Sequence, residues 1–106
     1  MTFTVFFSLE ASDDIDTAFD WLAARSPDAA ADLLRAIDRA ESHLVRNPAI
    51  YRVVRHTPSG DVRRVNLRPF RYQLYYLIVA RTVAVIACIH ASRSPRQHAR
   101  IVSRRA

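Results

Sequence analysis

A histidine and several arginines lie close together in the C-terminal half of the chain. His90 ends an apolar run, Arg93 follows it three residues later, and Arg64 and Arg68 precede the run. Cleavage of RNA without a metal needs a general acid or base, and cations that stabilise the phosphorane charge. His90 is the candidate acid or base, with these arginines as the cations. We favour the alternative, a strand-end histidine that hydrogen-bonds the backbone, because no acidic residue lies near it in sequence to orient the ring.

Three further side chains near these arginines can contact a flat or polar partner. Tyr75 can stack on a nucleobase, while Asn66 and Gln73 can hydrogen-bond to its edge. The competing interpretation, which we favour, is that the three line a groove for another protein chain. Both interpretations require the three residues to share one face of a sheet.

Neither a metal nor a cofactor is expected. His43, His56 and His98 are too scattered for a metal site, and the spacings typical of zinc ligands are missing. The chain has a single glycine, so it lacks a glycine-rich phosphate loop and nucleotide binding is not expected. Its one cysteine, Cys88, excludes an internal disulfide and is expected to be a small buried or half-buried filler.

The charge of the chain is divided unevenly. Residues 1–41 hold nine acidic residues and three arginines, whereas residues 42–106 hold thirteen arginines and only Asp61, within a net charge of +6. The basic half suits an anionic partner. The absence of lysine favours forked contacts to phosphate or carboxylate, although codon usage is the explanation that we prefer. Many of the arginines are expected to be solvated, but Arg93 and Arg96 follow the sheet and are expected to contact a partner.

The size and composition of the chain predict one globular domain spanning residues 1–106. Half of its 106 residues are apolar and a quarter are charged, which excludes a disordered chain. No apolar run is long enough to span a bilayer, and no signal peptide is visible. With a single cysteine, these features favour the reducing cytoplasm and no membrane partner.

Three antiparallel strands are predicted over residues 62–68, 71–79 and 82–90, where β-branched and aromatic residues are dense. The expected cross-strand pairs are Val79–Thr82, Leu74–Ala87 and Leu67–Tyr72. This register collects on one face the apolar side chains of Val65, Tyr72, Leu74, Tyr76, Ile78, Val83, Val85, Ala87 and Ile89. It collects on the opposite, open face Arg64, Asn66, Arg68, Gln73, Tyr75, Thr82, Cys88 and His90.

Two amphipathic helices are predicted before these strands. The first spans residues 13–25 with Ser12 as its N-cap, and the second runs from Pro27, capped by Ser26, to about Arg46. Because the linker is so short, the helices must form an antiparallel hairpin that covers the apolar face of the sheet. The fold class is therefore α+β.

Shorter elements complete the prediction. Residues 3–8 alternate as a short N-terminal strand, residues 51–54 suit a short edge strand, and residues 56–61 form a turn. Pro95 begins a short basic helix that reaches about Val102. Residues 103–106 are expected to be frayed.

This order of elements resembles the RelE/ParE superfamily of bacterial toxins. The matching segments are the strand Phe70-Arg-Tyr-Gln-Leu-Tyr-Tyr76, the run from Val83 to Ile89, the closing His90-Ala-Ser-Arg93-Ser-Pro-Arg96, the helix start at Ser26-Pro27 and the stop at Asn47-Pro48. The resemblance covers nearly the whole chain. It implies the toxin of a type II toxin–antitoxin pair, held inactive by a cognate antitoxin whose C-terminal segment adds a helix to the hairpin or a strand to a sheet edge.

The resemblance implies one of two activities. RelE-like members cut mRNA on the ribosome without a metal, whereas ParE-like members bind and poison DNA gyrase. Gln73 stands where RelE-like members tend to place an arginine, and the tail carries Gln97-His98-Ala99 with no tyrosine. These departures favour a gyrase inhibitor that is not an enzyme. In the alternative, a ribosome-dependent endoribonuclease, His90, Arg93 and Arg68 would be catalytic; a plain RNA-binding module is a remoter possibility.

Seven residues are expected to bind the target of the toxin. They are Arg64, Asn66, Arg68, Gln73, Tyr75, Arg93 and Arg96.

Overall fold

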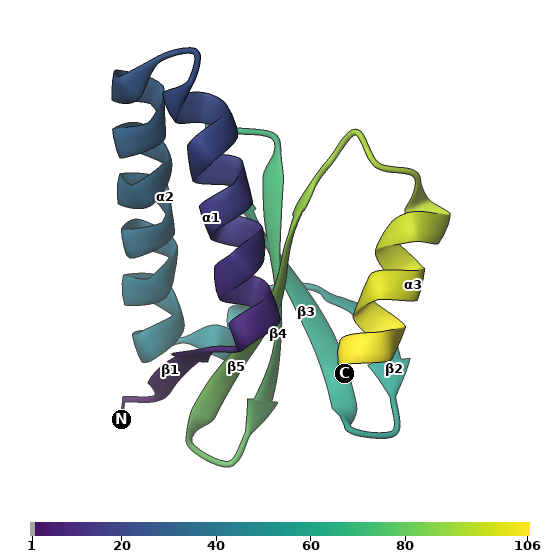
Figure 1. Ribbon diagram of the computed structural model, residues 1–106. Coiled ribbons are helices and arrows are strands. Elements are labelled where there is room, and N and C mark those ends of the chain that lie inside the picture. The colour runs from purple at the N-terminus through teal and green to yellow at the C-terminus, as the bar shows by residue number, and fades with distance from the viewer. Residues whose placement is uncertain (1) are drawn as a thin grey trace.

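The computed structural model describes residues 2–106. Five strands form one sheet in the order β1-β5-β4-β3-β2. The strands are β1 (Thr4–Phe7), β2 (Val53–Thr57), β3 (Gly60–Leu67), β4 (Tyr72–Val79) and β5 (Thr82–His90), and the helices are α1 (Leu9–Ala23), α2 (Pro27–Arg46) and α3 (Pro95–Arg105). In Figure 1, α1 and α2 form a hairpin on one side of the sheet and α3 lies on the other. The predicted α+β fold is confirmed.

The first helix begins earlier than predicted. Ser8, not Ser12, is its N-cap, because the Ser8 side chain accepts a hydrogen bond from the Ala11 N–H at 3.1 Å. The Ser12 N–H already donates to the Ser8 carbonyl at 2.9 Å, so Ser12 lies within the helix. Both serines are suitable caps, and residues 9–11 are acceptable helix formers, so local preference permits either start. Asp14 therefore lies in the second turn of the helix rather than the first, and its side chain reaches the sheet.

The second helix has the predicted bounds and packs with α1 over the sheet. The Ser26 side chain caps it by accepting from the Ala29 N–H at 3.2 Å. Leu33 and Leu44 are fully buried and share one hydrophobic core with Leu74 of β4. Burial of these stripes against the sheet is the main favourable term that holds the hairpin in place.

The strand meander follows the predicted register only in part. The pairs Val79–Thr82 and Leu67–Tyr72 are confirmed. Between Tyr76–Val85 and Tyr75–Ala87 the register shifts, so that Ile86 is a β-bulge and Leu74 faces Cys88 rather than Ala87. An extra residue exchanges the faces of everything beyond it. The predicted faces of the residues from Ala87 to His90 were therefore wrong: Cys88 and His90 belong to the hairpin side, with Leu74 and Tyr72.

The two edge strands of the sheet pair with their neighbours in different directions. β1 pairs parallel to β5, with Val5 opposite Val83, so the sheet is mixed rather than wholly antiparallel. At the other edge, β2 and β3 form an antiparallel hairpin. The predicted edge strand exists but extends to Thr57, and the turn is confined to residues 58–59, followed by Gly60 at a φ of 134°. Only glycine adopts such a φ readily, which explains the place of the single glycine.

The third helix covers part of the sheet face that was expected to be open. Ser94 and Gln97 form a capping box at its start, and Val102 is buried against Tyr75, Ile86 and other residues of that face. The helix continues to Arg105, so the expectation of a frayed end at residues 103–105 was wrong. The α1–α2 hairpin therefore covers one face of the sheet, and α3 covers part of the other. Among residues 2–106, no helix is long and apolar enough to cross a membrane.

The Asp14 carboxylate of α1 links the C-terminal helix α3 to strand β5. β1 pairs with β5 only as far as Val85, and beyond that point the Cys88 N–H donates to Asp14 Oδ2 at 2.9 Å. Arg105 Nη1 donates to the same oxygen at 2.6 Å and to the Ile86 carbonyl at 3.0 Å. The two side chains thus satisfy the backbone of β5 where its neighbouring strand ends.

Candidate functional site

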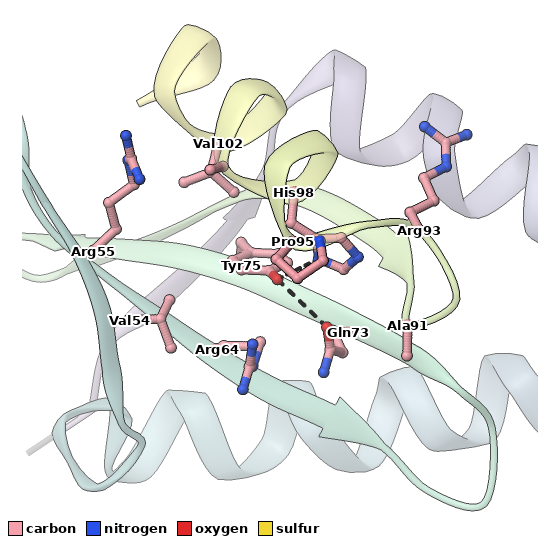
Figure 2. Close-up of a pocket in the computed structure, with 11 residues that line it drawn as sticks. Val54, Arg55, Arg64, Gln73, Tyr75, Ala91, Arg93, Pro95, His98 and Val102 are labelled. Carbon is pink, nitrogen blue, oxygen red and sulfur yellow. Dashed lines mark hydrogen bonds between the residues drawn. The ribbon is translucent and has the colours of Figure 1, made fainter.

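A groove of about 300 Å³ lies beside α3 on the sheet. Its lining, drawn in Figure 2, comes from β2, β3, β4, the segment after β5 and α3. Four of the predicted target-binding residues lie in it, namely Arg64, Gln73, Tyr75 and Arg93. The remaining wall is mostly apolar, with Val54 and Val102 on opposite sides.

Tyr75 and His98 form the centre of the groove. The Tyr75 hydroxyl lies 2.6 Å from His98 Nδ1 and 3.4 Å from Gln73 Oε1. His98 Nε2 lies 3.0 Å from the His90 carbonyl, which can only accept, so Nε2 carries a hydrogen. In the neutral ring Nδ1 then accepts the Tyr75 proton. That single hydroxyl proton is then not given to Gln73 Oε1, which can only accept. Gln73 is linked instead to β3, because its Nε2 donates to Asn66 Oδ1 at 3.0 Å.

His98 was not among the residues predicted for the site. Its exposed fraction is 9%, and both ring nitrogens have a partner within the chain. The signal that could have identified it is helical spacing: His98 and Val102 lie four residues apart on α3 and share the face that meets the sheet. His98 positions Tyr75 and holds the first turns of α3 on β5.

The arginines of the groove keep their charge available to a partner. Arg64 lies beside Gln73, whereas Arg55 and Arg93 stand at the two ends of the groove in Figure 2. None of the ion pairs within residues 2–106 involves these three side chains. No acidic residue is part of the lining. The groove is therefore a cationic surface with an apolar floor.

The other predicted residues lie outside the groove. Asn66 is exposed and belongs to its rim through Gln73. Arg68 is exposed in the turn after β3, and Arg96 is exposed in the first turn of α3. The structure thus places three of the seven predicted target-binding residues around the groove rather than in it.

His90 faces away from the groove because of the bulge in β5. Its ring packs edge-on against Tyr72 with centroids 4.9 Å apart. Its Nδ1 accepts from the Ser92 N–H at 3.0 Å and lies 2.7 Å from the Ser92 hydroxyl. His90 and Arg93 both line a second pocket, next to α1, which does not include Arg68. The three residues named for nuclease chemistry therefore do not share one pocket.

Two buried groups near the site are held in their neutral forms. Burial raises the pKa of the Cys88 thiol to about 12, and the Asp14 carboxylate adds to the rise. Burial also raises the pKa of the Tyr76 hydroxyl, which donates to the Pro48 carbonyl at 2.6 Å. Within residues 2–106, no three metal-ligating side chains come together.

Comparison with known proteins identifies a family and related solved structures. The family described as ParE toxin of type II toxin–antitoxin system, parDE, matches residues 5–95. Among solved structures, a chain of the chromosomal ParDE system from P. aeruginosa matches with a TM-score of 0.70 and 13% sequence identity, covering 86% of this chain and 98% of that chain. At this identity the likeness shows the fold. No protein of curated function matches the sequence.

Proposed function

Because the chain belongs to the ParE toxin family and is the toxin component of a type II toxin–antitoxin pair, we propose that it acts by binding and inhibiting DNA gyrase in the cytoplasm. A cognate antitoxin is its second partner. We propose that the inhibition involves no covalent chemistry on nucleic acid. The toxin is therefore a binding protein rather than an enzyme.

One observation carries the proposal of a binding mode. The groove that gathers Arg64 and Arg93 offers no free acid or base, since both nitrogens of His98 are engaged within the chain. General acid–base catalysis needs such a group within hydrogen-bond reach of the reacting atoms. Cations over an apolar floor are instead suited to docking against an acidic protein surface.

Gyrase and the antitoxin would contact different parts of the toxin. We propose that gyrase contacts the groove and its rim, including Arg96. The antitoxin's C-terminal segment would lie on the hairpin or pair with an edge strand, where main-chain hydrogen bonds are available. The basic C-terminal half would speed both encounters at low salt.

The test compares gyrase inhibition with mRNA cleavage by the same protein. The variant Arg64→Ala/Arg93→Ala is matched by Arg39→Ala/Arg46→Ala, which removes the same charge from exposed positions on α2. The first pair should raise the half-inhibitory concentration about tenfold or more, since arginine is a frequent hot-spot residue. The second pair should leave inhibition of gyrase supercoiling near its original level.

His90→Ala separates the inhibitor from the nuclease. In the proposed function it leaves accumulation of gyrase–DNA cleavage complexes unchanged, because no proton transfer takes place. Cleavage of mRNA at codon positions that disappears in His90→Ala, with gyrase unaffected, would replace the proposal by the endoribonuclease. Truncation from Pro95 is not a suitable test, because it removes Val102 and Arg105 from the packing of the sheet.

A further inference from the structure

A second pocket of about 710 Å³ lies at the edge of the sheet formed by the end of β5, between α1 and α3. It is bounded by α1, by the turn before β4, by the ends of β4 and β5, and by the C-terminal part of α3. Its volume is within the range of small-molecule sites. Neither the gyrase proposal nor the antitoxin proposal gives it a role.

Four ring systems line this pocket. Trp21 projects from α1, Phe70 from the turn before β4, and Tyr72 and His90 from adjacent strands. Trp21 is 53% exposed, so a large apolar ring remains in contact with solvent. The other three rings are half-buried. The Arg25 guanidinium lies 3.6 Å from the centre of the Trp21 ring and donates to the Trp21 carbonyl at 2.8 Å, so the orientation of the indole is held. Such rings are suited to stacking on another flat ring.

The charge of the pocket is positive. Arg71 and Arg93 line it and are exposed. Its one acidic lining residue, Asp14, is neutralised by Arg105 through contacts of 2.6 and 3.3 Å. Burial raises the pKa of Tyr72, and the charge of Arg93 opposes that rise. A forked guanidinium is the side chain that best matches a phosphate.

We propose that this pocket binds a nucleoside phosphate, with the base against Trp21 and Phe70 and the phosphate at Arg71 and Arg93. The nucleoside phosphate is either a free nucleotide or one unit of a single strand. This mode of recognition uses rings and guanidinium groups, so it needs no glycine-rich loop. A peptide carboxylate would satisfy the arginines but would leave the ring faces without a flat partner.

The test uses the intrinsic fluorescence of the intact chain. Trp21 is its only tryptophan, so its emission reports directly on the pocket. GMP should quench the emission saturably, guanosine should bind about tenfold more weakly or worse, and inorganic phosphate should leave the emission unchanged. Guanosine also controls for light absorption by the base. Equilibrium dialysis with labelled GMP provides a second measurement that does not depend on the indole.

Arg71→Ala is the discriminating variant, because Arg71 is exposed and lines only this pocket. It should weaken GMP binding about tenfold or more and leave guanosine binding nearly unchanged, whereas Arg39→Ala should affect neither. Tighter binding of a short single-stranded RNA than of GMP would identify a strand as the ligand. Equal binding of GMP and guanosine, or no loss in Arg71→Ala, would overturn the proposal. A response to poly-glutamate but not to GMP would assign the pocket to a protein partner instead.

Discussion

Replacing Asp14 by alanine should loosen the attachment of α3 to the sheet. Its carboxylate accepts from the backbone of Cys88 and from the guanidinium of Arg105, which in turn holds the Ile86 carbonyl. The Asp14 and Arg105 side chains are only 22% and 20% exposed, so water can replace these contacts poorly. The substitution therefore leaves a donor on β5 and a cation on α3 without their acceptor.

The magnitude follows from those two losses. A buried donor left without a partner costs about 1–3 kcal/mol. Removing one member of a fully buried ion pair costs about 3–5 kcal/mol, and the partial exposure of this pair reduces that figure. We expect a total loss of roughly 2–4 kcal/mol in the free energy of unfolding, which corresponds to a fall in Tm of roughly 10–25 °C for a domain of this size. Urea or thermal unfolding followed by circular dichroism measures it.

The chain offers a matched surface pair as a control. Asp32 and Arg35 are also joined at 2.6 Å, but their side chains are 56% and 63% exposed. Asp32→Ala should cost no more than about 0.5 kcal/mol. A double-mutant cycle of Asp14→Ala with Arg105→Ala should give a coupling energy of about 1 kcal/mol or more. A loss below about 1 kcal/mol for Asp14→Ala would refute the reasoning, since the least of its costs is the unpaired donor.

Two further predictions concern the buried neutral groups. Tyr76→Phe removes the donor to the Pro48 carbonyl and should lower the free energy of unfolding by about 1–2 kcal/mol, whereas Tyr51→Phe, at an exposed hydrogen bond, should cost less. The pKa of the Cys88 thiol is raised to about 12, so the folded state keeps a proton that the unfolded state releases. The free energy of unfolding is therefore unaffected by this group below the thiol's unfolded pKa, and it falls as pH rises from about 9 towards 12, by up to ~1.4 kcal/mol per pH unit. Urea unfolding at several alkaline pH values should show a steeper decline for the native chain than for Cys88→Ala; equal slopes would contradict it.

The helices and the meander could be predicted because their signals are local. The apolar spacing of α1 and α2, the start at Ser26-Pro27 and the pairs next to the tight turn at residues 80–81 all depend on residues close in sequence. The N-cap of α1 was wrong because two serines were both suitable. Local preference does not decide between two acceptable caps, and the packing of the helix against the sheet does.

The bulge at Ile86 could not be predicted. From Val83 to Ile89 the strand is apolar at every position, because helices cover both faces of the sheet here. Alternation carries register only where one face is polar, so a uniformly apolar strand allows an extra residue without any sign in the sequence. The face of His90 was therefore wrong, although its strand was right.

The position of α3 depends on contacts between distant residues. Asp14 and Arg105 are 91 positions apart, and no local pattern connects them. Ser94-Pro95 indicated where the helix begins, but neither its length nor the face it covers follows from its own residues. The partner of Tyr75, His98, was missed for the same reason.

The bulge also determines what each pocket contains. Without it, His90 would project to the same face as Gln73 and Tyr75, beside the arginines of the groove. With it, Ala87 and Ile89 take that face and share a buried apolar cluster with Tyr75 and Val102 beneath α3. The groove then obtains its histidine from α3, where both ring nitrogens are occupied, and its cations from β2, β3 and the segment after β5. The His90 imidazole is thereby separated from Arg55 and Arg64, and of the groove's cations only Arg93 also lines its pocket. Phosphoryl chemistry needs the acid or base and the cations around one atom, so this separation favours a docking surface. One inserted residue is thus the structural reason for preferring inhibition by binding.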